Sequence, residues 1–463
     1  MSAARDPLRF VHTADLHLDS PLKSLAARDA SLAHAVRTAS RTALVRTVDL
    51  CIDEAVDALV IAGDLYDGDQ RSMHTAAALT REMRRLHEAR IPVYLVRGNH
   101  DARSRITREL ALPDNVHGYD GRGGTHLLDG GRAAFHGVSF TRAHAPESLV
   151  GKLRAPVADA WNVGLLHTSL AGAEGHDVYA PCAVADLESR GYDYWALGHV
   201  HVRAVHREHA PAIVMPGNPQ GRDMGEDGPR SVTLATLDET AGTRLEARTV
   251  GPARFERLTL DATGVPDWQG LVRACEDALV ERREALEEEQ LIVRVELVGE
   301  SPLAWRVARD RDVLAELLRD TAGGLDGTWV DRVGSALVAP GERAGAAGDD
   351  AALDRLRDLV DEDLLGSPEL GDRVRAEVAD FLRKMPKGFR DRLGDTEERS
   401  AATVDALLRE GSRELLMRLH PGGPEDGPGG GSGDDAEGGP AAGPEDGPGD
   451  GAPVRGRASA AGA

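Results

Sequence analysis

Short apolar runs, each four or five residues long, recur through the first half of the chain and end in glycine or polar residues. The clearest runs occupy residues 58–62, 93–96, 163–166 and 194–197. Runs of this length with such boundaries are typical of buried β-strands, although periodicity alone leaves a helix open. An apolar-periodic segment at 43–56 precedes the first run. The pattern predicts a layered α/β fold.

The pattern changes after residue 250. Strand patterns at 255–260, 291–297 and 328–333 flank helical patterns at 268–286 and 305–318, which predicts a small α/β accessory domain at 252–338. A small-residue linker at 341–348 leads to helical patterns near 351–365, 373–382 and 403–419. A chain of 463 residues accommodates two or three such parts. We expect a first domain at 8–250, the accessory domain, a helical segment at 350–420 and a tail at 421–463.

The tail differs in composition from the rest of the chain. Of its 43 residues, 22 are Gly or Pro, so it lacks the apolar residues that a core needs. Such segments are typically disordered. We expect a disordered, acidic Gly/Pro tail.

Five short motifs place polar side chains next to predicted strands. A phosphodiester can be cleaved by two metal ions roughly 3.5–4 Å apart, which activate water and relieve charge on the phosphoryl oxygens. Such a pair needs a bridging carboxylate with oxygen and imidazole ligands around it. Functional groups gather at the carboxyl ends of strands in α/β folds. The sequence therefore predicts one such site, built from Asp15-Leu16-His17, Gly63-Asp64-Leu65-Tyr66-Asp67, Gly98-Asn99-His100-Asp101, His167-Thr168 and Gly198-His199-Val200-His201.

Asp64 is the candidate bridging carboxylate, because Gly63 lets the backbone turn sharply just before it. Asp15 and His17 are two residues apart and can reach one ion from the same strand end. Each motif alone is common, and its significance lies in all five occurring in order. The other histidines, such as His126 and His136, are expected to be surface or hydrogen-bonded residues.

The ordered set DxH, GDxxD, GNHD, H and GHxH resembles the calcineurin-like metallophosphoesterase superfamily over about residues 8–240. Two segments, FVHTADLHLDSPL at 10–22 and PGNPQGR at 216–222, are similar to the SbcD and YhaO type of bacterial DNA-repair exonuclease. The resemblance implies a four-layer αββα sandwich. It also implies the nuclease subunit of an SMC-like ATPase–nuclease complex.

The same resemblance assigns ligands to two divalent ions. One ion would be bound by Asp15, His17, Asp64 and His201. The other would be bound by Asp64, Asn99, His167 and His199. These ligands suit Mn²⁺, Fe²⁺ or Zn²⁺, and we expect Mn²⁺.

Three further motif residues have roles that the resemblance suggests. His100 would contact the scissile phosphate and help the leaving group depart, as a general acid. Asp101 would orient His100. Asp67 stands where archaeal and eukaryotic nucleases of this kind commonly have a histidine. It is therefore only a candidate for a residue that contacts the metal ligands and does not bind the metal itself.

The net charge of −22 is unusual for a DNA-binding protein, because DNA is bound mainly through phosphate contacts by Lys and Arg. The charge is uneven: residues 1–250 carry 28 basic and 32 acidic side chains, which leaves this part nearly neutral. Arginines near the metal motifs are candidate phosphate contacts, although they can equally be ordinary solvated residues. The candidates are Arg97, Arg103, Arg105 and Arg222.

Other features limit the compartment and the partners. Cys51, Cys182 and Cys275 have no paired spacing, which argues against a disulfide scaffold. No signal peptide or membrane-spanning run is visible, so we expect a cytoplasmic protein, associated with the nucleoid when acting.

The helical segment at 350–420 is a candidate for partner binding. In SbcD-like proteins, helices in this position dock on a coiled-coil ATPase. Packing on the chain's own domain explains the amphipathic pattern of the segment equally well. A homodimer is left open, and no membrane partner is expected.

The function expected from the sequence is metal-dependent cleavage of DNA phosphodiesters in repair, as an exonuclease that can also have endonuclease activity. Two alternatives remain at this stage. One is a phosphoesterase acting on small molecules or nucleotides with the same ions. The other is a mainly scaffolding subunit that binds DNA ends.

Overall fold

The computed structural model describes most of the first 340 residues and short parts of the remainder. The described ranges are 4–20, 30–66, 73–103, 112–170, 179–340, 359, 367–384, 404–405, 407–408 and 411–412. Asp67, Arg105, the side chain of Arg103 and the tail at 421–463 lie outside them. The chain divides into two units, Met1–His420 and Pro421–Ala463.

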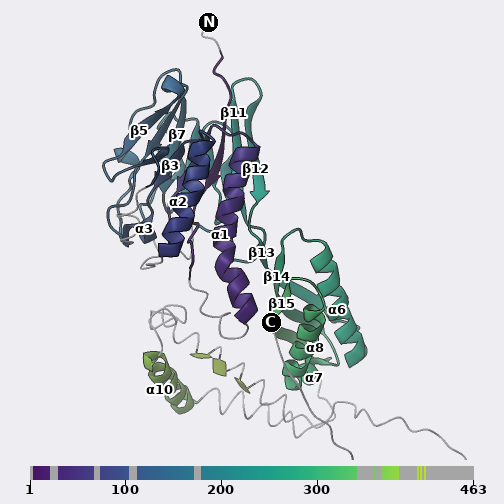
Figure 1. Ribbon diagram of the computed structural model, residues 1–463. Coiled ribbons are helices and arrows are strands. Elements are labelled where there is room, and N and C mark those ends of the chain that lie inside the picture. Colours follow the sequence, from purple (N-terminus) through teal and green to yellow (C-terminus); the bar gives the residue numbers. More distant parts are fainter. Residues whose placement is uncertain are drawn as a thin grey trace, which may run out of the picture. The chain divides into compact units, whose positions relative to one another are not determined.

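Two six-stranded sheets form the first half of the chain (Figure 1). The first sheet has the order β12-β11-β1-β2-β3-β4, built from β1 (Leu8–Thr13), β2 (Ala58–Ala62), β3 (Val93–Val96), β4 (Val116–Gly118), β11 (Ser231–Asp238) and β12 (Gly242–Thr249). The second has the order β5-β6-β7-β8-β10-β9, built from β5 (Gly124–Leu128), β6 (Ala133–Gly137), β7 (Trp161–His167), β8 (Tyr194–Gly198), β9 (Ala204–Arg207) and β10 (Ala212–Met215). All four strands predicted from the apolar runs are confirmed.

The two sheets pack face to face through one apolar core. Alternate residues of each strand point to opposite faces, so Phe10 and Val60 join this core while Val11 and Leu59 join the layer behind. Phe10 packs edge-on against Tyr194 of the second sheet, with ring centroids 5.0 Å apart. Strands buried on both faces must be apolar at nearly every position, which is why the sequence shows continuous runs.

Helices cover the outer face of each sheet. Helices α1 (Ala30–Asp53) and α2 (Met73–Glu88) pack on the first sheet through residues such as Leu44 and Met83. On the second sheet, α5 (Val184–Glu188) and the short helix η2 (Val150–Lys152) complete the outer side, where Leu187 and Val150 join Trp195 in a buried cluster. Another short helix, η1 (Asp129–Gly131), connects β5 to β6. The predicted four-layer αββα arrangement is confirmed.

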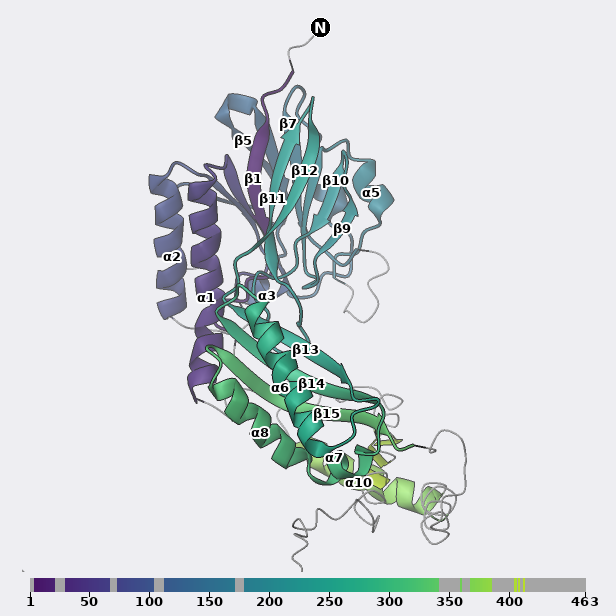
Figure 2. The same cartoon turned by 90° about the vertical axis from the view of Figure 1, so that its right-hand side faces the viewer.

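A third sheet follows, with three parallel strands in the order β13-β14-β15 (Figure 2). Its strands are β13 (Ala253–Asp261), β14 (Gln290–Glu300) and β15 (Thr328–Val338), and it shares an apolar core with α6 (Trp268–Glu284), α7 (Ala304–Arg309) and α8 (Arg311–Gly323). Helix α6 begins at the predicted residue, because the Asp267 carboxylate accepts a hydrogen bond from Gly270 N at 2.7 Å. The domain limits at 252 and 338 stay a prediction.

One helix prediction in this region is wrong in detail. The single helix expected at 305–318 is two helices that meet at Asp310, whose φ of −108° and ψ of 24° are not helical. The Asp310 carboxylate hydrogen-bonds the guanidinium of the preceding Arg309, with both contacts at 2.8 Å. Apolar periodicity continues across the break, so the sequence pattern does not reveal it.

Farther along the chain, α10 (Pro368–Lys384) contains the predicted helix at 373–382. Val404, Leu407 and Leu408 are helical, whereas Leu415, Leu416 and Leu419 lie outside the described residues, as does most of 351–365.

The three cysteines, Cys51, Cys182 and Cys275, are free and buried. Among the residues described, no helix has the length and apolar character needed to cross a membrane.

Candidate metal centre

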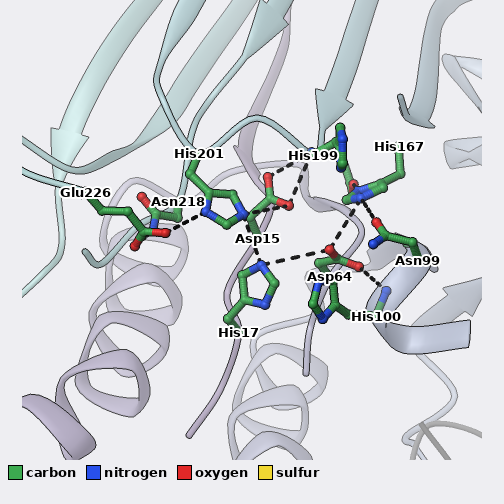
Figure 3. A network of polar contacts seen from close by, with 12 residues as sticks. Asp15, His17, Asp64, Asn99, His100, His167, His199, His201, Asn218 and Glu226 are labelled. Atoms are coloured by element: carbon green, nitrogen blue, oxygen red, sulfur yellow. Dashed lines mark hydrogen bonds and ion pairs between the residues drawn. The ribbon is translucent and has the colours of Figure 1, made fainter. Parts of the chain in front are cut away.

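The candidate site lies where strands of both large sheets end. Asp15 and His17 follow β1, Asp64 follows β2, and Asn99 and His100 follow β3, all from the first sheet. From the second sheet come His167, the last residue of β7, and two histidines after β8. Figure 3 shows these side chains turned toward one another, although nearly two hundred residues separate the first from the last. They are Asp15, His17, Asp64, Asn99, His100, His167, His199 and His201.

The backbone at the site adopts conformations that non-glycine residues rarely take. Asp15, His17 and Asp64 have φ of 53°, 40° and 52°, and His199 has φ of 109°. Cross-loop hydrogen bonds hold two of these turns together: Asp15 N donates to Gly63 O at 2.9 Å, and His17 N donates to Asp64 O at 3.0 Å. Strained conformations of this kind persist only when the surrounding structure fixes them, and they cluster at functional sites.

Asp15, His17 and His201 form a first group of converging ligand atoms, all within 4.8 Å of one another. The Nε2 atoms of His17 and His201 are 3.1 Å apart, and His201 Nε2 is 4.0 Å from Asp15 Oδ1. Imidazole nitrogens bind a divalent ion such as Zn²⁺ at about 2.0–2.1 Å, so two of them at right angles lie about 3 Å apart. The group therefore fits one divalent ion.

A second group consists of Asp15, Asp64 and His167, also within 4.8 Å of one another. His167 Nε2 is 3.4 Å from Asp64 Oδ2 and 3.0 Å from Asn99 Oδ1. Asp64 Oδ2 also lies 3.9 Å from His17 Nε2 in the first group. Asp64 thus reaches both groups, as a bridging carboxylate must.

His199 belongs to neither group among the residues described. Its backbone N–H donates to both carboxylate oxygens of Asp15, at 3.2 and 2.9 Å, and its ring is edge-on to that of His167 with centroids 5.2 Å apart. The structure therefore brings His199 beside the second group, and its role as a ligand stays a proposal.

Burial and neighbouring charges shift the pKa values of the candidate ligands. Burial opposes the ionisation of Asp64, but the neighbouring His167, His17 and His100 hold the pKa of its carboxyl well below the usual range. Burial lowers the pKa of His167, yet the Asp64 carboxylate outweighs it and raises that pKa to about 9. Burial and then Arg222 lower the pKa of His17, which keeps this ring neutral, as a metal ligand must be. The opposite shifts of His167 and Asp64 reflect their close pairing, with 3.4 Å between His167 Nε2 and Asp64 Oδ2.

Comparison with known proteins agrees with this geometry. Residues 8–203 match the family model described as calcineurin-like phosphoesterase, and residues 255–337 match the one described as the middle domain of metallophosphoesterase YhaO. An uncharacterized metallophosphoesterase YhaO of Bacillus subtilis is 30% identical over 315 residues, which are 67% of this chain and 76% of that protein.

The chain belongs to the calcineurin-like metallophosphoesterase family. This metallophosphoesterase is also similar to archaeal proteins named DNA double-strand break repair protein Mre11. The one from Methanopyrus kandleri is 28% identical over 46% of this chain and 49% of its own length. The one from Haloferax volcanii is 25% identical over 86% of this chain and 88% of its own length. Members of the family hydrolyse phosphate esters with divalent metals, so the predicted chemistry is confirmed at this level.

Asp101 of the metallophosphoesterase holds two loops together. Its carboxylate accepts hydrogen bonds from the backbone N–H groups of Leu65 and Tyr66, both at 3.2 Å, and of Gly98, at 3.1 Å. Burial and then Asp64 raise the pKa of Asp101 to about 7. These contacts join the ends of β2 and β3, and the expected effect of Asp101 on His100 stays a prediction. The backbone N–H of His100 donates to Asp64 Oδ1 at 3.0 Å.

Sequence reasoning missed Glu226. Its Oε1 lies 2.7 Å from His201 Nδ1, and Asn218 donates to its other oxygen at 2.8 Å (Figure 3). Arg222, a candidate DNA contact, pairs with the same carboxylate at 2.5 Å. Arg97 is half-buried after β3. Contacts of Arg97 and Arg222 with DNA stay predictions, and those of Arg103 and Arg105 rest on side chains outside the described part.

Three glycines of the motifs have no room for a side chain. A Cβ on Gly98 would lie 2.2 Å from Asp64 Oδ1 and 2.8 Å from His167 Nε2. A Cβ on Gly63 would lie 2.5 Å from His167 Nδ1, and one on Gly198 would lie 2.1 Å from Ala62 O. The motifs therefore need glycine, because candidate ligands pack directly on the backbone at Gly63 and Gly98 and a backbone oxygen does so at Gly198.

We predict that Gly98→Ala displaces Asp64 and His167 and weakens Mn²⁺ binding by about 10- to 100-fold, the usual range when groups that orient ligands are disturbed. Isothermal titration calorimetry of the purified chain with Mn²⁺ measures this. Gly118→Ala is the matched control, because a Cβ there meets nothing within 4 Å. Equal Mn²⁺ affinity in both variants would contradict the assigned ligand packing.

Proposed function

We propose that the chain is a metal-dependent phosphodiesterase that acts on DNA in repair, mainly as an exonuclease and also with endonuclease activity. The observation that carries the proposal is the position of Asp64, whose Oδ2 lies within 4 Å of imidazole nitrogens in both ligand groups. Support for DNA as the substrate comes from similarity to the protein of Haloferax volcanii named for DNA double-strand break repair, over most of both chains. Such a role belongs in the cytoplasm, at the nucleoid.

The side chains have distinct roles in this proposal. Two divalent ions, when bound, supply an activated water and neutralise charge on the phosphoryl oxygens. Asp15, His17 and His201 hold one ion, while Asn99, His167 and His199 hold the other. Asp64 is shared between them. The mixture of carboxylate, amide and imidazole ligands suits Mn²⁺, which we propose, as well as Fe²⁺ or Zn²⁺.

His100 has the position of a general acid. Its backbone N–H is fixed by Asp64 Oδ1, and its ring is edge-on to His17 with centroids 4.9 Å apart. It therefore lies beside the ligands and in neither ligand group. A proton donated from its ring to the departing sugar oxygen would avoid release of a strongly basic alkoxide.

The substrate class is tested with four labelled substrates in Mn²⁺: duplex DNA, single-stranded DNA, a cyclic nucleotide and an aryl phosphate. We predict shortening of duplex DNA, and loss of that activity on addition of a chelator. Arg97→Ala is expected to reduce cleavage of DNA and leave the aryl phosphate unaffected. Hydrolysis of the small esters alone would show the alternative, a small-molecule phosphoesterase. Binding of DNA ends without any hydrolysis would indicate a scaffolding subunit.

The role of His100 is tested by comparing leaving groups. A nitrophenolate departs without a proton, whereas the sugar oxygen of DNA needs one. We predict that His100→Ala lowers kcat for DNA by about 100- to 10,000-fold and changes hydrolysis of bis(nitrophenyl) phosphate much less. Mn²⁺ affinity, measured by calorimetry, should stay at the wild-type value. An equal loss for both esters would rule out proton donation by His100.

A partner is proposed for the segment at 350–420. Three of its described apolar side chains are exposed: Leu359 at 53%, Phe381 at 58% and Leu407 at 49%. Exposed large apolar side chains in amphipathic helices are typical of surfaces that bind another helix. We propose that this segment docks on the coiled coil of an SMC-like ATPase.

The partner proposal is tested by co-purification of tagged chains from their native cells, with mass spectrometry of what is bound. A chain ending at residue 420 should retain a coiled-coil ATPase and full nuclease activity. A chain ending at residue 340 should lose the ATPase and keep hydrolysis of an aryl phosphodiester. Retention of the ATPase by the shorter chain would exclude this segment as the docking site.

A further inference from the structure

The two histidines that best define the ligand groups are held in different ways. His167 is fully buried, and its Nδ1 donates to a backbone carbonyl, that of Ala62, at 2.9 Å. His201 is 22% exposed, and its Nδ1 lies against a side chain, that of Glu226, at 2.7 Å. An imidazole binds a metal through one nitrogen, and the hydrogen bond of the other nitrogen sets its tautomer and orientation. The Glu226 side chain therefore provides the hydrogen bond to His201 Nδ1 that a main-chain carbonyl provides to His167 Nδ1.

Glu226 is itself fixed by four donor groups of Asn218 and Arg222. Asn218 Nδ2 donates to Oε2 at 2.8 Å and Arg222 N donates to Oε2 at 2.9 Å. Arg222 Nη2 donates to Oε1 at 2.5 Å, and Arg222 Nε donates to Oε1 at 3.0 Å and to Oε2 at 3.1 Å. Arg222 Nη2 also lies 3.1 Å from His201 Nδ1, but a guanidinium cannot accept a hydrogen bond. The Nδ1 proton consequently goes to Glu226 Oε1. This arrangement leaves His201 Nε2 facing His17 and Asp15.

The loop that carries Glu226 is anchored at several points. Arg230 Nη1 donates to Asn218 Oδ1 at 2.9 Å and to His201 O at 2.5 Å. Gly228 N donates to Phe255 O at 2.9 Å, on strand β13. Arg257 of the same strand donates to Asp227 Oδ2 at 2.9 Å. Asp227, next to Glu226, thus anchors the loop without touching His201 in any contact found among the described residues.

We propose that Glu226 is a positioning residue that holds His201 on the ion bound with Asp15 and His17, and that it acts on this ion alone. The proposal rests on the two-ion function above and adds that the two ions depend on different supports. Removing Glu226 should release one ion and leave the other, because His167, Asn99 and Asp64 have no contact with the loop at 218–230 in the described structure.

The test measures Mn²⁺ binding to the full-length chain without DNA, using two-site calorimetry and the Mn²⁺ electron paramagnetic resonance signal of coupled pairs. Wild-type protein should bind two ions. Glu226→Ala should weaken one binding step by about 10- to 100-fold, leave the other unchanged and abolish the coupled signal. Glu226→Gln should weaken that step less, because its amide oxygen can still accept the Nδ1 proton. Asp227→Asn, the matched control in the same loop, should behave as wild type.

A purely structural role would give a different result. Equal weakening of both steps, together with a lower melting temperature in Glu226→Ala, would overturn the proposal, and so would two unchanged steps. Failure of the wild-type chain to bind two ions would overturn the proposed function along with it. Two ions bound in the wild type, with DNA left intact, would refute only the nuclease activity.

The tautomer of His201 gives a second readout. Nitrogen-15 spectra of histidine distinguish a ring protonated at Nδ1 from one protonated at Nε2. In the metal-free chain, we expect His201 to carry its proton on Nδ1 in the wild type and in Asp227→Asn, and to lose this preference in Glu226→Ala. An unchanged tautomer in Glu226→Ala would show that Glu226 does not set the orientation of His201.

Discussion

The burial of Asp15 and Asp64 within a few ångströms of each other is the constraint on which the site depends. Each residue is only 1% exposed, and removing an ionised carboxylate from water costs several kcal/mol unless opposite charge compensates it. The imidazoles around Asp64 provide part of that compensation, as the raised pKa of His167 shows. Two divalent cations would supply it more completely, because they would bring four positive charges into the same volume. The electrostatics and the ligand geometry thus agree on the same occupant.

The fold provides this arrangement by ending strands of two sheets at one place. The first sheet alone would present both carboxylates with His17 and His100, but without the three histidines of the second sheet. The sheet core, through pairs such as Phe10 and Tyr194, fixes the distance between the two sets of strand ends. Left-handed turns then point the side chains inward, and Asp101 ties two of the turns together through backbone N–H groups. The free energy gained from apolar packing therefore offsets the free-energy cost of the strained backbone and of the buried charges.

Much of this could be predicted from sequence, because strands and ligands are encoded locally. The run at 58–62 followed by Gly63 and Asp64 contains the strand, the turn and the carboxylate in seven consecutive residues. Glu226 could not be found in this way, because its partner His201 is 25 residues away and strands β9 and β10 lie between them. The break at Asp310 cannot be predicted either, because apolar periodicity continues across the residue whose non-helical φ and ψ separate the two helices. Local sequence patterns identify the candidate ligands, whereas the residues that hold these ligands in place are determined by tertiary contacts.

The supports differ between the two sides of the site in a way that follows from the sheets. His167 is the last residue of a central strand, so main-chain atoms of the neighbouring sheet are within reach of its Nδ1. His201 lies in the connection between β8 and β9, and its Nδ1 contacts a side chain, that of Glu226, instead of a backbone carbonyl. That side chain comes from a loop bonded to β13, the first strand of the third sheet. One candidate ligand is therefore fixed by the two large sheets themselves, while the other is held by contacts that continue into the third sheet.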